Sequence, residues 1–444
     1  MNKYLSAIFS RLNEKYYYQK EYLQTVLGFF NSIDEIVKSD SQIEELGIIE
    51  RLVEPDRIIT FKVPWQDDQG NIKVNIGYRI QFNNLIGPYK GGIRFDASVN
   101  ESVLKFLGFE QTFKNALTGL PLGGAKGGSD FNPLDKSDNE IMRFCQSYMV
   151  ELYNYIGPDR DIPAGDLGVG AKEVGYMFGM YKRLTQTHNG TFTGKGLSFG
   201  GSLLRPEATG YGLCYITEKA LNTYYNTSLK DKTVIISGTG NVAIPTAKKA
   251  TTLGAKVIAM SNITGVVYDS NGIDVDLISS LAKENKPLSD YLKTYSHVTF
   301  NKDLKSIWKI KTDVALPCAT QNEIDEDDAD SLLKNGLILL GEGANRPSTN
   351  EAIDLLIKNK IVLIPSKAAN AGGVATSGLE MSQNAMNLPW SSNEVDEKLK
   401  DIMNNIFNEI YETALSHSDP YNLEKGANIY SFLKILDAMK AQGL

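Results

Sequence analysis

Three lysines in the first half of the chain lie in contexts that surface lysines rarely occupy. Lys90 lies in the segment GPYKGG, Lys126 in LGGAKGG and Lys114 in EQTFKN. Glycine has no side chain, so the backbone and the ammonium group can both approach a ligand closely. Several ammonium groups in one pocket would bind a small molecule with more than one negative charge, and each would lower the pKa of the others. A lysine whose pKa falls towards neutrality can act as a general base.

Two nearby segments supply further candidates for the same site. Gln111 lies three residues before Lys114 on a predicted helix, residues 100–117, so the two side chains share one face. Asp166 lies in the glycine-rich segment PAGDLGVG, where an aspartate most often stabilises a turn, but beside lysines it would carry protons. Ala164 in the same segment is a predicted substrate contact.

A second pattern predicts a nucleotide site in the other half of the chain. A β-branched run at 233–237, a helix at 241–253 and a strand at 256–260 form a βαβ unit. The loop between the first strand and the helix reads GxGxxA, which is the dinucleotide fingerprint with alanine at its third position.

Each residue of this loop has a physical reason. Gly238 permits the tight turn, and Gly240 lets backbone N–H groups approach a pyrophosphate at the helix N-terminus. An acid after the second strand would bind the ribose 2′-hydroxyl and repel a 2′-phosphate, but Ser261 and Asn262 stand there instead. The sequence therefore favours NADP over NAD, with use of both as the alternative.

Three later apolar runs suit further strands of the same parallel sheet: residues 314–316, 337–340 and 361–364. Ligands of such sheets bind beyond the carboxyl ends of the strands. The segments that follow the runs are therefore predicted binding loops: residues 317–321, 341–345 and 366–370. Asn345, which ends the second loop, is a predicted cofactor contact.

The first half of the chain reads as a separate α/β domain. It begins with helical segments, the first of them amphipathic. A strand at 57–65 and a strictly alternating run at 72–82, joined by a polar turn, predict a hairpin with one buried face. Pro64 places the first of these strands at an edge or a strand end.

Composition excludes several function classes. The chain has 444 residues, which predicts two or three domains, and its 46 Lys and Arg against 53 Asp and Glu give a net charge of −7. That charge does not suit a nucleic-acid binder. No apolar run approaches the roughly 18 residues that span a membrane. Three cysteines without a CxxC pair and three scattered histidines argue against disulfides, a zinc site and a serine–histidine triad, and they favour a cytoplasmic protein.

With these residues in view, the chain resembles the hexameric bacterial-type glutamate dehydrogenases of the Glu/Leu/Phe/Val dehydrogenase family. The likeness runs from about residue 50 to the C-terminus and rests on long motifs: GPYKGGIRF, KFLGFEQTFKNALTGLPLGGAKGGSDF, IGPDRDIPAGDLGVG, RPEATGYG, LPCATQNE, KAANAGGVATSGLEMSQNA and GANI. It implies an α/β fold with two domains separated by a cleft. Residues 1–200, completed by 424–444, would bind substrate and form the oligomer, and residues 201–423 would form a Rossmann-like NAD(P)-binding domain.

The resemblance also implies a role for each substrate-site residue. Lys90 and Ser377 would bind the side-chain carboxylate of the substrate, while Lys114 and Gln111 would hold its α-carboxylate. Lys126 would activate water.

For the remaining chemistry, the resemblance makes Asp166 the proton carrier to and from the amine. It implies that the cofactor contacts include Thr209, Asn241, Val242, Ala319, Thr320, Gln321 and Asn370, with Asn370 near the nicotinamide.

The implied reaction is the reversible oxidative deamination of L-glutamate to 2-oxoglutarate and ammonia, by a homohexamer without a metal. The chain departs from the family pattern at Asp96-Ala97, at Ala125 and at Arg346, and we expect these changes to affect rate rather than reaction type. Two alternatives remain open. A dehydrogenase of an apolar amino acid would leave Lys90 and Ser377 without a partner, and a non-catalytic nucleotide-binding relative is expected to have lost Lys126 or Asp166.

Overall fold

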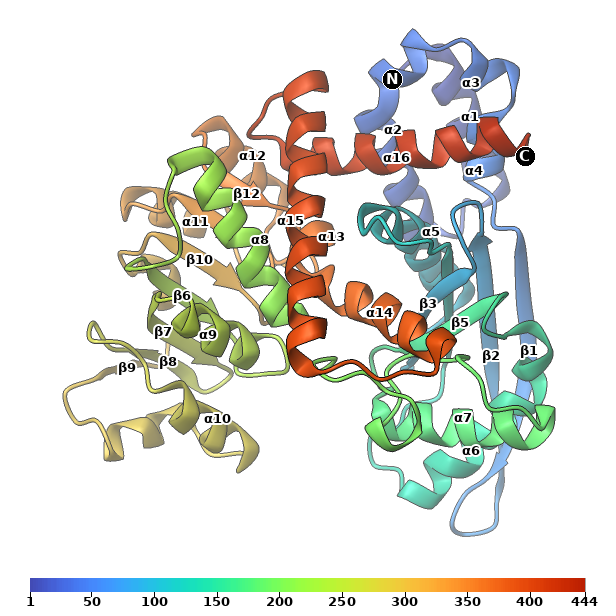
Figure 1. Cartoon of the computed structure of the whole chain (residues 1–444), viewed down its shortest axis with the longest axis horizontal. Helices are drawn as coiled ribbons and strands as arrows, with labels where there is room; N and C mark the ends of the chain where they lie inside the picture. The colour runs from blue at the N-terminus through green and yellow to red at the C-terminus, as the bar shows by residue number, and fades with distance from the viewer. Residues whose placement is uncertain (444) are drawn as a thin grey trace. The chain divides into compact units, whose positions relative to one another are not determined.

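The computed structural model describes residues 1–443 and divides into two compact units (Figure 1). Unit 1 comprises Met1–Arg205, Thr376–Val395 and Asn428–Leu444, and unit 2 comprises Pro206–Ala375 and Asp396–Ala427. The segment Thr376–Val395 was expected with the nucleotide-binding residues 201–423, but its contacts lie in unit 1. Within it, Glu380 pairs with Lys195, and a Cβ on Gly378 would collide with Leu120.

Unit 1 is built on a five-stranded sheet of order β1-β2-β4-β3-β5. The strands are β1 Arg57–Gln66, β2 Ile72–Asn83, β3 Tyr89–Phe95, β4 Gly124–Ser129 and β5 Asp161–Gly165. The first two form the predicted antiparallel hairpin, and β1 is the edge strand, as Pro64 indicated. β3 runs parallel to both β4 and β5, so the residues of these three strands lie side by side.

The prediction that β2 buries one face along its whole length is wrong for its outer end. Ile80 and Phe82 are buried, but Ile72 and Val74 are 68% and 58% exposed. β4 pairs with β2 only over Gly77–Asn83, so the outer end of β2 pairs with β1 alone. The tip of the hairpin therefore extends beyond the rest of the sheet.

Two apolar cores hold the helices of unit 1 to this sheet. The predicted amphipathic N-terminal helix is α1, which buries Leu5, Ile8 and Leu12. The helix predicted at 100–117 is α5, and the side chain of Asn100 caps it by accepting from the Val103 N–H. The remaining helices that lie wholly or partly in unit 1 are α2 Lys20–Ser39, α3 Gln42–Glu45, α4 Ile48–Leu52, α6 Asp138–Leu152, α7 Ala171–Thr185, α14 Gly372–Met386, α15 Ser392–His417 and α16 Leu423–Gln442, with α1 at Lys3–Lys15 and α5 at Glu101–Leu117.

Unit 2 contains a seven-stranded sheet of order β12-β11-β10-β6-β7-β8-β9, in which the first five strands are parallel. The strands are β6 Thr233–Ser237, β7 Lys256–Asn262, β8 Gly265–Tyr268, β9 Thr299–Asn301, β10 Val314–Pro317, β11 Leu339–Gly341 and β12 Val362–Ile364. All five strands predicted from the sequence are confirmed. The carboxyl ends of β12, β11, β10, β6 and β7 therefore lie at one edge of this sheet.

Helices connect and cover these strands. They are α8 Ala208–Tyr225, α9 Ala243–Thr252, α10 Val275–Lys283, α11 Glu326–Lys334, α12 Asn350–Lys358 and α13 Ser366–Ala369. Short 3-10 helices occupy Tyr153–Tyr155 and Leu197–Phe199 in unit 1, and Leu288–Lys293 and Leu304–Lys309 in unit 2. The predicted βαβ unit is formed by β6, α9 and β7.

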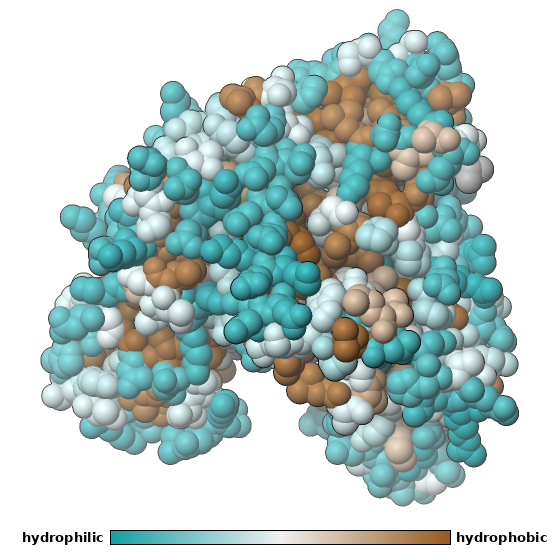
Figure 2. Space-filling view, in the orientation of Figure 1, coloured by the Kyte–Doolittle hydropathy of each residue, from teal (hydrophilic) through white to brown (hydrophobic). Residues whose placement is uncertain are grey.

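The surface seen in Figure 2 is mainly hydrophilic, with scattered apolar patches. All three histidines are exposed, and all three cysteines are buried thiols. Among residues 1–443, no helix has both the length and the apolar character needed to cross a membrane.

A fully buried ion pair crosses the sheet of unit 1. Arg79 on β2 donates through Nε to Asp161 on β5 at 2.9 Å and through a second nitrogen to the other carboxylate oxygen. It also donates to the Gly91 carbonyl at 3.0 Å, and Asp161 accepts from Gln81 at 2.9 Å. Because both charges are buried, each depends on the other.

We expect Arg79→Met to lower the free energy of unfolding by about 3–5 kcal/mol, because it leaves the Asp161 carboxylate buried without its cation. Denaturant-induced unfolding of the whole chain measures this. Lys334→Met, which breaks an exposed pair with Asp330, is the control and should cost under about 1 kcal/mol. Equal effects of the two substitutions would contradict the prediction.

Candidate active site

Two parallel strands and one helix bring the three lysines into unit 1. Lys90 lies on β3 and is 2% exposed, and Lys126 lies on the adjacent β4 and is 5% exposed. Lys114 lies near the end of α5 and is half-buried. Asn115, the next residue of this helix, donates through its amide to the carbonyls of Lys90 and Gly123. This one side chain therefore attaches α5 to both lysine-bearing segments.

The glycines around the lysines serve the packing of the protein itself. A Cβ on Gly91 would lie 1.6 Å from the carbonyl oxygen of Ala125, and one on Gly124 would lie 2.0 Å from Thr112 Oγ1. The sequence suggested that these glycines let a ligand approach. In the structure these glycines instead let β3, β4 and α5 pack closely, so that their lysines share one region.

Burial and like charge lower the pKa values of the lysines. The pKa of Lys114 falls to about 8, first by burial and then by the charge of Lys126. The pKa of Lys90 falls to about 7, first by burial and then by Arg79 and Arg205. Burial also lowers the pKa of Lys126, although the carboxylate of Asp166 opposes the shift. The prediction that these lysines lower one another's pKa is therefore confirmed only for the effect of Lys126 on Lys114, and burial is the larger cause there.

Lys126 pairs with the predicted proton carrier. Its Nζ lies 3.0 Å from Asp166 Oδ2, and Arg94 Nε lies 2.8 Å from the same oxygen. The charges of Lys126 and Arg94 outweigh the opposing effect of burial and lower the pKa of Asp166 to about 2. Sequence reasoning missed Arg94, although it is four residues after Lys90 on one strand and therefore shares its face.

A second missed cation is Arg205. Its Nε donates to Ser377 Oγ at 3.2 Å, and Ser377 is 2% exposed on α14. The charge of Arg205 lowers the pKa of both Lys90 and Lys114, so it lies near both. Its only signal in the sequence was its place in the segment RPEATGYG.

The remaining predicted substrate contacts also lie in unit 1. Gln111 on α5 donates to the Asn115 side chain at 2.6 Å, and Ala164 on β5 pairs with Gly92 on β3. Ala125 is buried in β4, where its carbonyl faces Gly91, and Asp96 accepts from the Ser98 N–H at 2.9 Å in a local turn.

In unit 2, the fingerprint loop has the geometry that a dinucleotide needs. Gly238 has a φ of +89°, a conformation that L-residues other than glycine rarely adopt. A Cβ on Gly240 would meet nothing within 4 Å, so the space beside it is open. Asn241 and Val242 follow, and α9 begins at Ala243. The residues present therefore fit the phosphates of a dinucleotide at a helix N-terminus.

The neighbouring loops hold further candidates at the same sheet edge. Ser237 Oγ donates to Glu323 at 2.9 Å, and Glu323 accepts from the N–H groups of Ala319 and Thr320. Glu323, which sequence reasoning missed, thus shapes the loop that contains Gln321.

Three other predicted contacts lie near this edge. Asn370 donates to the side chain of Asn345 at 2.9 Å, which joins the loops after β11 and β12. Thr209 lies in the first turn of α8, where a Cβ on the next residue, Gly210, would lie 2.8 Å from the carbonyl oxygen of Val242.

The end of β7, which would meet the ribose, has no acidic side chain. Ser261 is 7% exposed, and the side-chain Oδ1 of Asn262 accepts from the N–H and hydroxyl of Thr264 at 2.8 and 2.6 Å. Ile263 is 94% exposed. Among residues 1–443, no group of three or more His, Cys, Asp or Glu side chains could hold a metal ion.

We expect Lys90→Met to raise the melting temperature of the ligand-free protein at pH 6.5. Because the pKa of Lys90 is about 7 in the fold against a usual 10.5, the unfolded chain binds more protons between these values. The free energy of unfolding therefore rises with pH through that window, and the cost of burying protonated Lys90 is largest below about pH 7. Removing about 1 kcal/mol of this cost would raise the melting temperature by roughly 2–4 °C.

The gain from Lys90→Met should shrink at pH 10, and differential scanning fluorimetry at both pH values measures it. Lys20→Met, at an exposed lysine, is the control. A gain of the same size at the two pH values would contradict the assigned cause.

Known proteins share both halves of this arrangement. Residues 55–183 match the Glu/Leu/Phe/Val dehydrogenase dimerisation domain, and residues 200–443 match the Glutamate/Leucine/Phenylalanine/Valine dehydrogenase family.

The chain is 55% identical over 444 residues to the NAD-specific glutamate dehydrogenase of Bacteroides fragilis, with 99% of each chain covered. It is 49% identical over 448 residues to the NADP-specific glutamate dehydrogenase of Helicobacter pylori, with 99% of this chain and 100% of that protein covered. A solved structure of Plasmodium falciparum glutamate dehydrogenase superposes on this chain with a TM-score of 0.95. The two are 46% identical, and the match covers 100% of this chain and 95% of that chain. The chain therefore belongs to the Glu/Leu/Phe/Val dehydrogenase family.

Proposed function

We propose that this protein catalyses the reversible oxidative deamination of L-glutamate to 2-oxoglutarate and ammonia, with NAD or NADP as the hydride acceptor. The observation that carries the proposal is the group of cations gathered in unit 1. Lys90 and Lys126 lie on paired strands, Lys114 lies on the helix that Asn115 bonds to both lysine-bearing segments, and Arg205 donates to Ser377. A ligand with two carboxylates would add negative charge beside these cations and favour their charged forms.

The two ends of glutamate would be held by different residues. Lys90, Arg205 and Ser377 suit the side-chain carboxylate, because a guanidinium and a hydroxyl already lie within hydrogen-bond distance of each other there. Lys114 and Gln111, on one face of α5, suit the α-carboxylate, and Ala164 would line the space between. Bound in this way, the substrate raises the pKa of each lysine and strengthens its own binding.

Lys126 and Asp166 would move the protons. A bound nicotinamide cofactor would supply the hydride acceptor for the α-carbon of glutamate, so that 2-iminoglutarate forms. Neutral Lys126 would take a proton from a water molecule, whose oxygen adds to the imine carbon. Asp166 would pass this proton from Lys126 to the nitrogen. Lys126 would then take the proton of the new hydroxyl as the C–N bond breaks, which releases ammonia and 2-oxoglutarate.

The edge of the sheet in unit 2 would hold the cofactor. Gly238, Gly240, Asn241 and Val242 suit its pyrophosphate, and the other candidates are Thr209, Ser261, Asn262, Ala319, Thr320, Gln321, Asn345 and Asn370. Since no carboxylate stands at residues 261–264, nothing there would repel a 2′-phosphate, which favours NADP and permits NAD.

The resemblance to the hexameric enzymes of this family supports a proposal for assembly and location. We infer a homohexamer in the cytoplasm that acts on glutamate, 2-oxoglutarate and ammonia, without a metal, a nucleic acid or a membrane as partner. Analytical ultracentrifugation tests the number of subunits.

We expect Lys126→Ala to lower kcat by about 10²–10⁴-fold, because it removes the general base. The affinity for NADPH and NADH, measured by fluorescence titration, should be unchanged. Lys20→Ala, at an exposed lysine, is the control and should keep wild-type turnover. Full turnover by Lys126→Ala would end the proposed role of Lys126.

We expect kcat/KM for glutamate to exceed that for leucine by a factor on the order of 10⁴, because leucine leaves the buried cations beside Ser377 unpaired. Initial rates with NAD and NADP in turn measure this preference and the choice of cofactor together. A preference for leucine would establish the apolar alternative. Tight cofactor binding without a change in NAD(P)H absorbance on addition of glutamate would establish a non-catalytic protein.

A further inference from the structure

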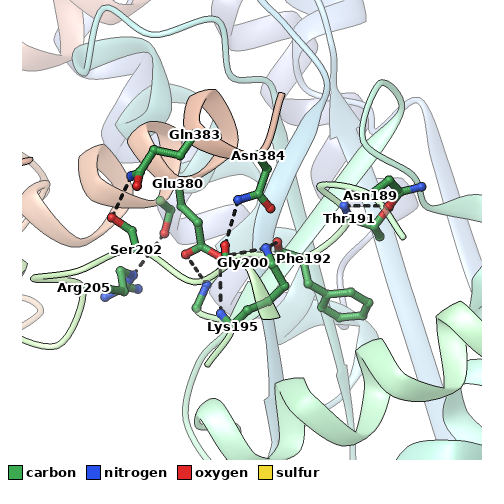
Figure 3. Close-up of polar contacts among 12 residues, drawn as sticks. Asn189, Thr191, Phe192, Lys195, Gly200, Ser202, Arg205, Glu380, Gln383 and Asn384 are labelled. Atoms are coloured by element: carbon green, nitrogen blue, oxygen red, sulfur yellow. Dashed lines mark hydrogen bonds and ion pairs between the residues drawn. The ribbon is translucent and has the colours of Figure 1, made fainter. Parts of the chain in front are cut away.

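One face of α14 holds the segment 192–205 through four side chains (Figure 3). These four side chains lie on one side of the helix, because the other three are each three or four residues from Glu380 and residues at such separations are neighbours on a helix surface. The pairs are Ser377 with Arg205, Glu380 with Lys195, Gln383 with Ser202 and Asn384 with Gly200. The segment that ends at Arg205 therefore takes its place from this helix.

The centre of the contact is an ion pair without access to water. Lys195 Nζ lies 2.8 Å from Glu380 Oε1, and the two side chains are 1% and 0% exposed. The other oxygen of Glu380 accepts the Gly194 N–H at 2.8 Å, and Lys195 Nζ donates to the Phe192 carbonyl at 2.5 Å. The carboxylate thus fixes both the side chain and the backbone of the segment.

The backbone of this segment needs such support. Phe192 and Leu204 have positive φ values of 73° and 60°, which cost free energy for residues with a Cβ. Leu204 directly precedes Arg205, so its conformation sets where the guanidinium begins. The other end of the strained part is tied to β5, because the Thr193 N–H donates to the Pro163 carbonyl at 2.9 Å.

We propose that the Lys195–Glu380 ion pair is a positioning pair, which holds Arg205 and Ser377 in place and thereby sets the preference for a substrate with a side-chain carboxylate. Ser377 precedes Glu380 by one turn of α14, so a shift of the helix against the segment would separate Ser377 from Arg205. The charge of Glu380 also opposes the effect of burial, which lowers the pKa of Lys90 and of Arg205.

The test compares glutamate with L-norvaline, which has a methyl group in place of the side-chain carboxylate. This inference rests on the proposed function, so the wild-type enzyme is assayed first, and its failure to oxidise glutamate would refute that function instead. We expect Glu380→Gln to lower the ratio of kcat/KM for glutamate to that for norvaline by between about ten-fold and about 10²-fold. The KM for the cofactor should be unchanged.

A second variant separates positioning from folding. Glu380→Gln leaves the Lys195 ammonium buried without its anion, so the single variant is liable to unfold. Lys195→Met combined with Glu380→Met removes both charges and keeps a packed interior, and its melting temperature reports whether it folds. We expect the same loss of preference in this folded double variant.

Asn384→Ala is the matched control, because it removes an exposed contact between the same helix and the same segment. It should keep the wild-type ratio. A double variant that folds and prefers glutamate as strongly as the wild type would overturn the inference. Equal losses with glutamate and norvaline would also overturn it, because they would show a general structural effect.

Discussion

Buried positive charge is the constraint on which unit 1 depends. Taking an ammonium or guanidinium group out of water is costly unless an anion and hydrogen bonds replace the lost hydration. In unit 1 three carboxylates supply such anions. Asp161 pairs with Arg79, Asp166 pairs with Lys126 and Arg94, and Glu380 pairs with Lys195. The lowered pKa values of Lys90 and Lys114 show that their surroundings still disfavour the charged form. A dicarboxylate ligand would favour the charged forms, which links the burial of these lysines to the proposed selectivity.

The backbone makes this concentration of charge possible. Glycines allow β3, β4 and α5 to approach so closely that added Cβ atoms would collide with the neighbouring backbone or side chain. Asn115 then bonds to the carbonyls on either side of the contact. Lys90, Lys114 and Lys126 lie on the three elements that this contact joins, so the packing of the backbone sets where each lysine begins.

Unit 2 uses a different physical principle for its ligand. Five parallel strands end at one edge, and the loops that follow them contain backbone N–H groups and amide side chains such as Gln321, Asn345 and Asn370. Hydrogen bonds inside the protein shape these loops, as with Glu323 beside Ala319 and Thr320, and Asn370 beside Asn345. Such a surface suits a large ligand with a phosphate centre and polar groups at both ends.

The sequence by itself determined the parts of this protein that local patterns specify. The run at 233–237, the GxGxxA loop and the three later apolar runs indicated the parallel sheet, because strand propensity, glycine turns and period-two alternation act over a few residues. The unusual settings of Lys90, Lys114 and Lys126 indicated an anion site for the same reason.

Only the tertiary structure decided which charges meet. Lys195 and Glu380 are 185 residues apart, and nothing in either local segment indicates the other. Arg205 and Arg94 were missed because their partners come from other elements. Ile72 and Val74 were expected to be buried because alternation within one strand does not reveal how far the rest of the sheet extends beside it. Ion pairs and burial depend on packing between distant segments, whereas periodicity and propensity record only the preference of each segment alone.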